Sequence, residues 1–316
     1  MQAKRVEGSA PRPRLRDGSV PRVIPDLDLL TRKGWRAVGR RIDLSGEHAW
    51  LDAPMSAGAR VRDGWLQETA DRIGGTVRED VAGAGLMADF AALDGPGFAA
   101  ADLRHEVRDF YEHTSDWRME VWTGWTPIFW PGGELVSRLF GRRVEQLALP
   151  TRPLDVARGM DSRVSVLEDA SGEQHSAGWL RTLRSTGEYV YSGCYSFRTL
   201  PGADRPSVHV AFPLENGNVQ VFLRPELDAD GSLRLFSPGD PFGGNGAYVV
   251  VRDGGSTYAA RAPIHETFHV YVDEEGTLRT DHQLRIWSAT AVRLHYKLER
   301  KVRSRMVSED SGNRRP

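Results

Sequence analysis

The stretch HETFHVYVDEEG, residues 265–276, decides how the C-terminal half of this chain is interpreted. Phe268, Val270 and Val272 occupy every second position, which is the period of a half-buried strand, and Asp273-Glu274-Glu275-Gly276 then supplies a turn. Short alternating segments separated by turn residues continue in both directions, from about residue 163 to about residue 300. The pattern predicts one strand after another in this half, without a helix.

These segments favour an antiparallel arrangement, because the turns between them are short. The other legible turns are Glu215-Asn216-Gly217-Asn218, Asp228-Ala229-Asp230-Gly231 and Asp253-Gly254-Gly255. About ten strands are more than a flat open sheet usually carries. We therefore predict an α+β protein whose C-terminal part is an antiparallel β-barrel or a strongly curved sheet, with a helical N-terminal layer packed on it.

The N-terminal half has helical signals. The whole chain is predicted to have four regions. Residues 1–25 and 302–316 are polar and are expected to be disordered tails around a helical and aromatic region (26–150) and a barrel domain (151–301). Three amphipathic helices are predicted at about residues 63–74, 99–114 and 133–146, and residues 118–123 are expected to be extended.

Composition excludes several classes of protein. A formal net charge of −1 gives no general attraction to nucleic acid, and Cys194, the single cysteine, permits neither an intrachain disulfide nor a thiolate cluster. The N-terminus has no apolar signal segment, and no run is long enough to cross a bilayer. We expect a soluble cytoplasmic protein with no nucleic-acid partner and no integral membrane association.

Residues 265–269 also match the HExxH pattern of zinc hydrolases, in which two histidines on one face of a helix bind zinc. The match fails on a strand, where His265 and His269 would be about 13 Å apart at about 3.3 Å per residue. Were the segment helical, His282 would be the third ligand to test. The strand pattern predicts that the match is a coincidence, and we predict no metal and no cofactor.

Polar residues recur at alternate positions of several predicted strands, between bulky aliphatic residues, and they form the first candidate site. If the sheet closes, these residues either line its interior or form its solvated outside. In the first case His209, Gln220 and Arg224 would orient a ligand, and His269, Tyr271, Arg293 and His295 would supply acid, base and charge-stabilising groups.

Three tryptophans, Trp122, Trp125 and Trp130, lie within nine residues and form the second candidate site. They are expected to pack against the sheet, to provide a stacking wall for a flat apolar ligand or, least favoured of the three, to anchor the protein at a membrane surface.

The segment FYEHTSDWRMEVWTGWTPIFWPGGELVSRLFGRRVEQLALP, residues 110–150, resembles a segment of the bacterial YndJ-like family. The shared features are an aromatic-Tyr-Glu start, a Val-Trp-x-x-Trp core, and an arginine-containing Leu-Phe helix that ends Gln-Leu-x-Leu-Pro. The stretch from Thr280-Asp281-His282 to Leu294-His295-Tyr296 is similar to the end of related proteins. The resemblance implies a self-contained bacterial module and assigns no activity or catalytic residue.

The sequence leads to one preferred function and three alternatives. The preferred function is binding of a bulky apolar small molecule, of the lipid, polyketide or terpenoid type, in a barrel lumen. The alternatives are a cofactor-independent cyclase or isomerase using the same pocket, a zinc hydrolase through residues 265–269, and a structural or partner-binding module. Whether the protein is an enzyme stays open at this point.

Overall fold

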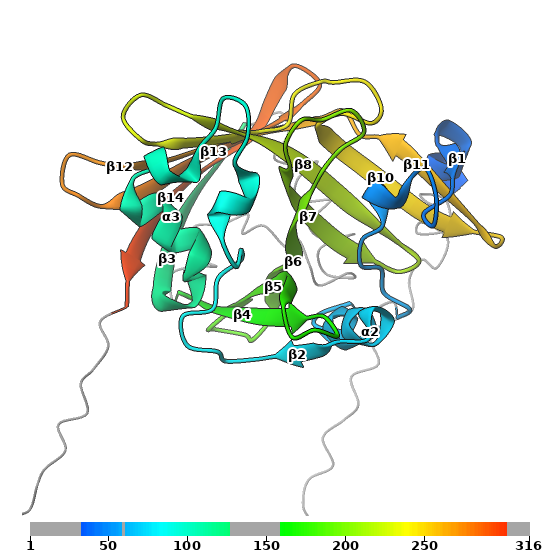
Figure 1. Ribbon diagram of the computed structural model, residues 1–316, viewed down its shortest axis with the longest axis horizontal. Coiled ribbons are helices and arrows are strands. Elements are labelled where there is room, and N and C mark those ends of the chain that lie inside the picture. The colour runs from blue at the N-terminus through cyan, green and yellow to red at the C-terminus, as the bar shows by residue number, and fades with distance from the viewer. Residues whose placement is uncertain (1–32, 59–60, 127–158, 302–316) are drawn as a thin grey trace, which may run out of the picture.

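Antiparallel strands make up about half of the residues that the computed structural model describes, which are residues 33–58, 61–126 and 159–301. They belong to one sheet of fourteen strands (Figure 1). In chain order the strands are β1 (Arg40–Ile42), β2 (Thr76–Arg78), β3 (Trp117–Trp125), β4 (Met160–Glu168), β5 (Gln174–Leu183), β6 (Tyr189–Arg198), β7 (Ser207–Leu214), β8 (Gly217–Leu227), β9 (Leu233–Phe236), β10 (Gly246–Asp253), β11 (Ser256–Arg261), β12 (Ile264–Val272), β13 (Leu278–Ile286) and β14 (Ala289–Arg300).

The sheet has one main path and one branch. The main path runs β2-β4-β5-β6-β7-β8-β9-β12-β13-β14-β3, and the branch runs from β8 through β10 and β11 to β1. The branch arises because β8 is long: residues 217–222 pair with β10, and residues 224–227 pair with β9. The four turns predicted from the sequence connect β7 to β8, β8 to β9, β10 to β11 and β12 to β13.

The sheet is strongly curved and open. Register shifts at residues 167/168, 181/182 and 284/285 mark irregularities of the kind that bends strands. Figure 1 shows the ribbon turning from β2 and β4, past β6 to β8, toward β12 to β14. Within the described residues the end strands β2 and β3 are not paired with each other, so the curved-sheet form of the predicted fold is the one observed.

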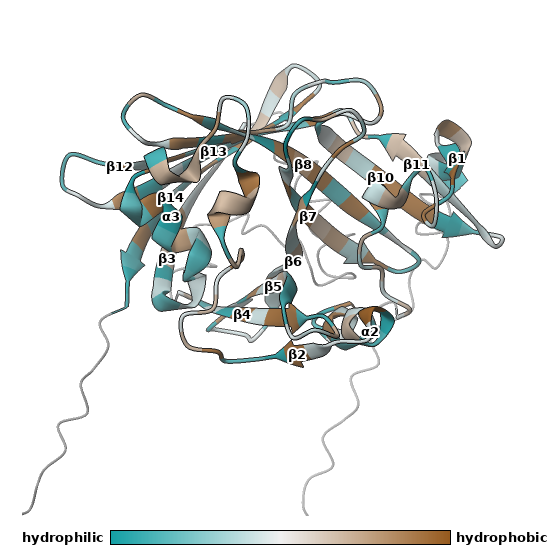
Figure 2. Cartoon of the chain, viewed as in Figure 1, coloured by the Kyte–Doolittle hydropathy of each residue, from teal (hydrophilic) through white to brown (hydrophobic). Residues whose placement is uncertain are grey.

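Alternating side chains give the sheet two faces with separate cores, as the banding of hydropathy along β7, β8 and β10 illustrates (Figure 2). The concave face carries the largest cluster, which includes Val210, Val221 and Phe110. On the convex face, residues 42–56 pack over β8, β10 and β11, with Trp50 against Phe222 and Tyr248.

Helix α2 (Gly64–Ile73) covers the convex face at β4 to β6. Its C-terminal end agrees with the predicted helix at about residues 63–74. It ends at Gly74, whose φ of 67° is the left-handed conformation that favours glycine. Asp63, at the N-cap position of α2, makes no capping hydrogen bond. Its carboxylate accepts hydrogen bonds from Arg163 (2.9 Å) and Tyr189 (2.8 Å), which join the start of α2 to the sheet.

The second predicted helix is shorter than expected. Residues 99–114 contain a 3₁₀ turn at Ala100–Asp102 and helix α3 (His105–Glu112), separated where the Arg104 amide donates to the carbonyl of Gly231 at 2.8 Å. Phe110 and Tyr111 of α3 reach the concave side of the sheet. The predicted helix at residues 133–146 lies outside the described residues. No described helix has the length and hydrophobicity needed to cross a bilayer.

Candidate functional site

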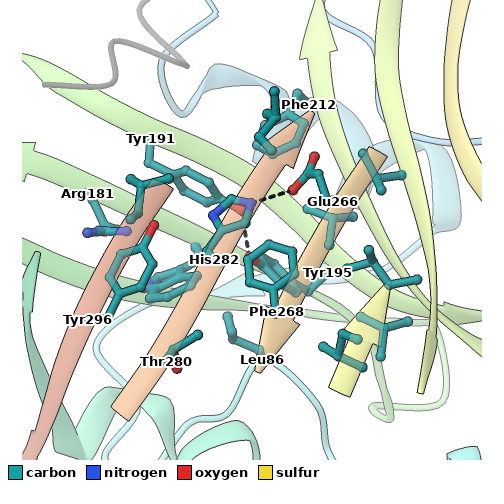
Figure 3. A pocket seen from close by; sticks show the side chains of 18 of the residues that line it. Leu86, Arg181, Tyr191, Tyr195, Phe212, Glu266, Phe268, Thr280, His282 and Tyr296 are labelled. Carbon is teal, nitrogen blue, oxygen red and sulfur yellow. Dashed lines mark hydrogen bonds and ion pairs between the residues drawn. The ribbon is translucent and has the colours of Figure 1, made fainter. Parts of the chain in front are cut away.

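A cavity of about 210 Å³ lies on the concave face of the sheet. Side chains from β3 to β10, from β12 to β14, and from α3 line it, together with Leu86 from the loop before α3. Figure 3 shows that these side chains converge from strands that are far apart in the chain. The cavity is therefore a product of the curvature of the sheet and not of one local motif.

Most of the cavity wall is apolar because every second residue of the central strands is hydrophobic and faces this side of the sheet. On β7 and β8, cross-strand partners such as Val210 and Val221 meet on this face, and Val208 with Leu223 and Phe212 with Val219 do the same. Such a wall favours an apolar ligand, and the few polar groups among it would set the ligand's orientation.

One of these polar groups is the pair Glu266–His282, on neighbouring strands β12 and β13. The His282 Nε2 atom lies 3.0 Å from a Glu266 carboxylate oxygen, so Nε2 carries a proton that it donates to the carboxylate. The imidazole stacks on Phe268 at a centroid separation of 3.8 Å. Within the described part of the chain, the His282 Nδ1 atom is buried without a hydrogen-bond partner. The pair thus presents one imidazole nitrogen, Nδ1, that makes no hydrogen bond to the described residues.

The second polar group is centred on Arg181 of β5, whose residue is 7% exposed. Its guanidinium lies within 6 Å of the rings of Trp179 (5.3 Å), Tyr191 (5.9 Å) and Tyr296 (5.8 Å). The Tyr191 and Tyr195 hydroxyls are 2.6 Å apart. Burial raises the pKa of each of Tyr191, Tyr195 and Tyr296, so these phenols stay protonated at neutral pH.

The HExxH match lies on strand β12, as the sequence pattern predicts, and not on a helix. Glu266 lines the concave cavity, whereas His269 lines a depression on the other face of the sheet. His265, four residues before His269, shares its face, so the two imidazoles lie on the side opposite to the carboxylate. In the described ranges, no group of three or more His, Cys, Asp or Glu side chains is arranged to hold a metal ion.

His209 and Gln220, expected as ligand-orienting residues, are buried on the convex face. His209 bonds to Ser196 (3.0 Å) through Nδ1 and to the Gln220 side-chain oxygen (2.9 Å) through Nε2. The Gln220 amide donates to the Leu51 carbonyl at 2.7 Å and to Asn218 at 2.8 Å. Burial is the main cause that lowers the pKa of His209 to about 3, so its imidazole is neutral. This network attaches the segment around residue 51 to the sheet. Arg224 is on the same face, half-exposed, over the Phe236 ring at 4.5 Å.

The four residues expected to be catalytic lie together on the convex face of β12 and β14. His295 contacts Asp281 at 2.7 Å, and Tyr271 donates to the same carboxylate at 3.3 Å. His269 stacks on Tyr271 at 4.7 Å and approaches Ser232 at 3.2 Å. Arg293, His295 and His269 line an open depression of about 490 Å³. They form a polar surface cluster separate from the concave cavity.

Trp122 borders this surface depression, is half-exposed, and lies 5.9 Å from the His295 ring. Trp125 belongs to β3, but its side chain, like all of Trp130, falls outside the described residues. Cys194 is buried, and burial raises the pKa of its thiol to about 11, as expected for a packed and unreactive thiol.

Sequence reasoning named Glu266 and His282 only as parts of a possible zinc site and missed Arg181 and Tyr296, because it selected polar residues that alternate with the apolar stripe. Those positions face away from the concave side. The useful signal was a polar residue in phase with the stripe: Glu266 before Phe268 and Val270, Tyr296 between Leu294 and Leu298, and Arg181 between Trp179 and Leu183.

Comparison with protein-family models, with curated proteins and with solved structures finds no match for this chain.

Proposed function

We propose that this protein binds a compact apolar small molecule in the cavity on the concave face of its sheet. The observation that carries the proposal is an apolar cavity of about 210 Å³ with a few polar groups among its lining side chains. An engineered apolar cavity of about 150 Å³ binds benzene, so a volume of about 210 Å³ suits a molecule of roughly ten non-hydrogen atoms. Among the ligand types expected from the sequence, a small terpenoid fits this volume better than a long-chain lipid.

Binding is tested with a graded series of apolar probes, from benzene through naphthalene to long-chain alcohols. We expect the small cyclic probes to raise the melting temperature and to bind with measurable heat, and the long chains to have little effect. Val221→Phe replaces an isopropyl group in the cavity wall with an aromatic ring, and it should remove binding while the protein stays folded. Arg293→Gln, on the exposed opposite face, is the matched control and should bind like the unchanged protein. Equal binding by Val221→Phe, or no binding by any probe, would contradict the proposal.

The Glu266–His282 pair favours a second candidate function, acid–base catalysis of the cyclase or isomerase type in the same cavity. A carboxylate bonded to Nε2 orients the imidazole, and the uncommitted Nδ1 is positioned to accept a proton from a bound molecule. Protein-dependent deuterium incorporation into a bound ketone in D₂O would support it. Glu266→Gln should then keep ligand binding and slow the exchange by about 10²-fold. Exchange that is unchanged in Glu266→Gln would leave a binding protein only.

A further inference from the structure

Arg181 is a buried positive charge whose neighbours in the described part of the chain do not neutralise it. Its residue is 7% exposed and lines the cavity. Around it are three aromatic rings and, at 4.0 Å, the thioether sulfur of Met160. Among the described residues no carboxylate oxygen lies within 4.0 Å of its guanidinium nitrogens. A buried charge without a counter-ion is unfavourable, so such groups are normally paired.

The acidic group of the cavity does not serve as this counter-ion. Glu266 is bonded to His282 at 3.0 Å. Figure 3 shows Arg181 beside Tyr296 and Tyr191, with Glu266 on the far side of His282. Both tyrosines lie close enough to Arg181 and to Glu266 for each charge to influence their hydroxyl groups. The cavity therefore has a guanidinium on one side and a carboxylate on the other, with Tyr191, Tyr296 and His282 between them.

We propose that Arg181 binds the carboxylate of a ligand, so that the natural ligands are small apolar carboxylic acids. This inference rests on the proposed binding function and specifies its ligand class. A guanidinium presents a planar set of N–H donors that matches the two oxygens of a carboxylate, and the protonated Tyr296 phenol beside it is a further donor. A phosphate has more acceptor oxygens than one arginine and the neighbouring phenols can hydrogen-bond, so some of them would be left unsatisfied. The Glu266 carboxylate on the other side of the cavity repels a second anion and thus fixes the orientation of the ligand.

The volume of the cavity limits the rest of the ligand. A carboxylate takes three of the roughly ten non-hydrogen atoms that a cavity of about 210 Å³ holds, which leaves about one ring and a short linker. The probes are therefore 3-phenylpropanoate, the amide 3-phenylpropanamide of nearly the same shape, and propylbenzene, which has no polar group.

Titration calorimetry of the full chain with these three probes tests the assignment. We expect the carboxylate to bind at least tenfold more tightly than the amide. Arg181→Met replaces the charge with an apolar side chain that the surrounding rings tolerate, so the protein should fold. In this variant the preference for the carboxylate should disappear, whereas propylbenzene should still bind. Arg181→Lys should keep part of the preference because it keeps the charge.

The possible outcomes separate this inference from the function on which it rests. Equal affinities of the unchanged protein for carboxylate and amide, with propylbenzene still bound, would overturn the role of Arg181 and leave the apolar binding function intact. A preference for the carboxylate that survives in Arg181→Met would place the anion elsewhere. Binding of none of the three probes would remove both proposals. The affinity ratio of the unchanged protein decides the question even where a variant does not fold.

Discussion

At the scale of single residues, His209 shows how a titratable group can serve the fold and not the chemistry. Both of its ring nitrogens have partners, Ser196 and Gln220, and its ring stacks on Phe222 at 4.5 Å. The Gln220 oxygen can only accept, so Nε2 carries the proton and Nδ1 accepts from the Ser196 hydroxyl. Protonation of Nδ1 would break this arrangement and bury a charge near Arg198, which already disfavours it.

This arrangement predicts a loss of stability in mild acid. The unfolded chain takes up a proton on this histidine near pH 6.5, whereas the folded chain does so only near pH 3, so the free energy of unfolding falls as the pH drops between these values. From pH 7 to pH 5 the contribution of His209 is about 2 kcal/mol. Urea unfolding at both pH values should show a loss smaller by about that amount in His209→Gln. His105→Gln, at an exposed position, is the control and should behave like the unchanged protein. A loss of the same size in His209→Gln would contradict the assignment.

At the scale of elements, α3 and the loop before it close part of the cavity through a tight backbone contact. A Cβ atom at Gly85 would lie 2.2 Å from the carbonyl oxygen of Glu112, at the end of α3. The next residue, Leu86, lines the cavity, as do Phe110 and Tyr111 of α3. Gly85 is therefore required for the loop and the helix to lie this close together.

Gly85→Ala should lower the free energy of unfolding by about 2 kcal/mol or more, because the added methyl group cannot be accommodated without a backbone shift. It should also weaken the binding of cavity probes. Gly64→Ala is the matched control: nothing lies within 4 Å of its Cβ position at the start of α2, so we expect unchanged or slightly higher stability. Denaturant unfolding of both variants measures the effect, and equal stabilities would show that the contact is not a constraint.

The elements themselves were largely predictable, and the faces of the sheet were not. Alternation placed β12 correctly through residues 265–272, because period two is a local property of the sequence. Alternation is the same for both faces, however, and only the direction of curvature decides which one becomes concave. His269 was therefore expected at the site and Glu266, its neighbour three positions earlier, was not. Arg181 was overlooked for a second reason: its burial among aromatic rings depends on Tyr191 of β6 and Tyr296 of β14, which the sequence alone does not bring together.

At the scale of the whole molecule, the N-terminal segment supplies every outer strand of the described sheet. The main path ends in β2 and β3, and the branch ends in β1, and all three come from the first 125 residues. The strands from residue 160 onward occupy the interior positions between them. Unpaired strand edges promote association between molecules, and β1 and β2, with three residues each, leave shorter free edges than the strands they cover.

Removal of residues 1–126 should therefore produce a chain that self-associates. The deletion leaves β4, β11 and β14 with free edges and removes Phe110 and Tyr111 from the cavity wall. We expect size-exclusion chromatography to show aggregates for the deleted chain and a defined species for the full chain. The deletion of residues 1–32 alone, which precede β1, is the control and should leave the elution unchanged. A well-dispersed, cooperatively unfolding fragment would show that the outer strands are dispensable.

The pairing of β3 with β14 also governs the order of events during synthesis on the ribosome. Trp117 lies opposite Arg300, so the partner of β3 is among the last parts of the described chain to be made. About 160 further residues are made between β3 and β14, and closing so long a loop is slow. The nascent polypeptide thus depends on β14 before the described sheet can be completed, and any interruption of translation before that point leaves β3 without its partner.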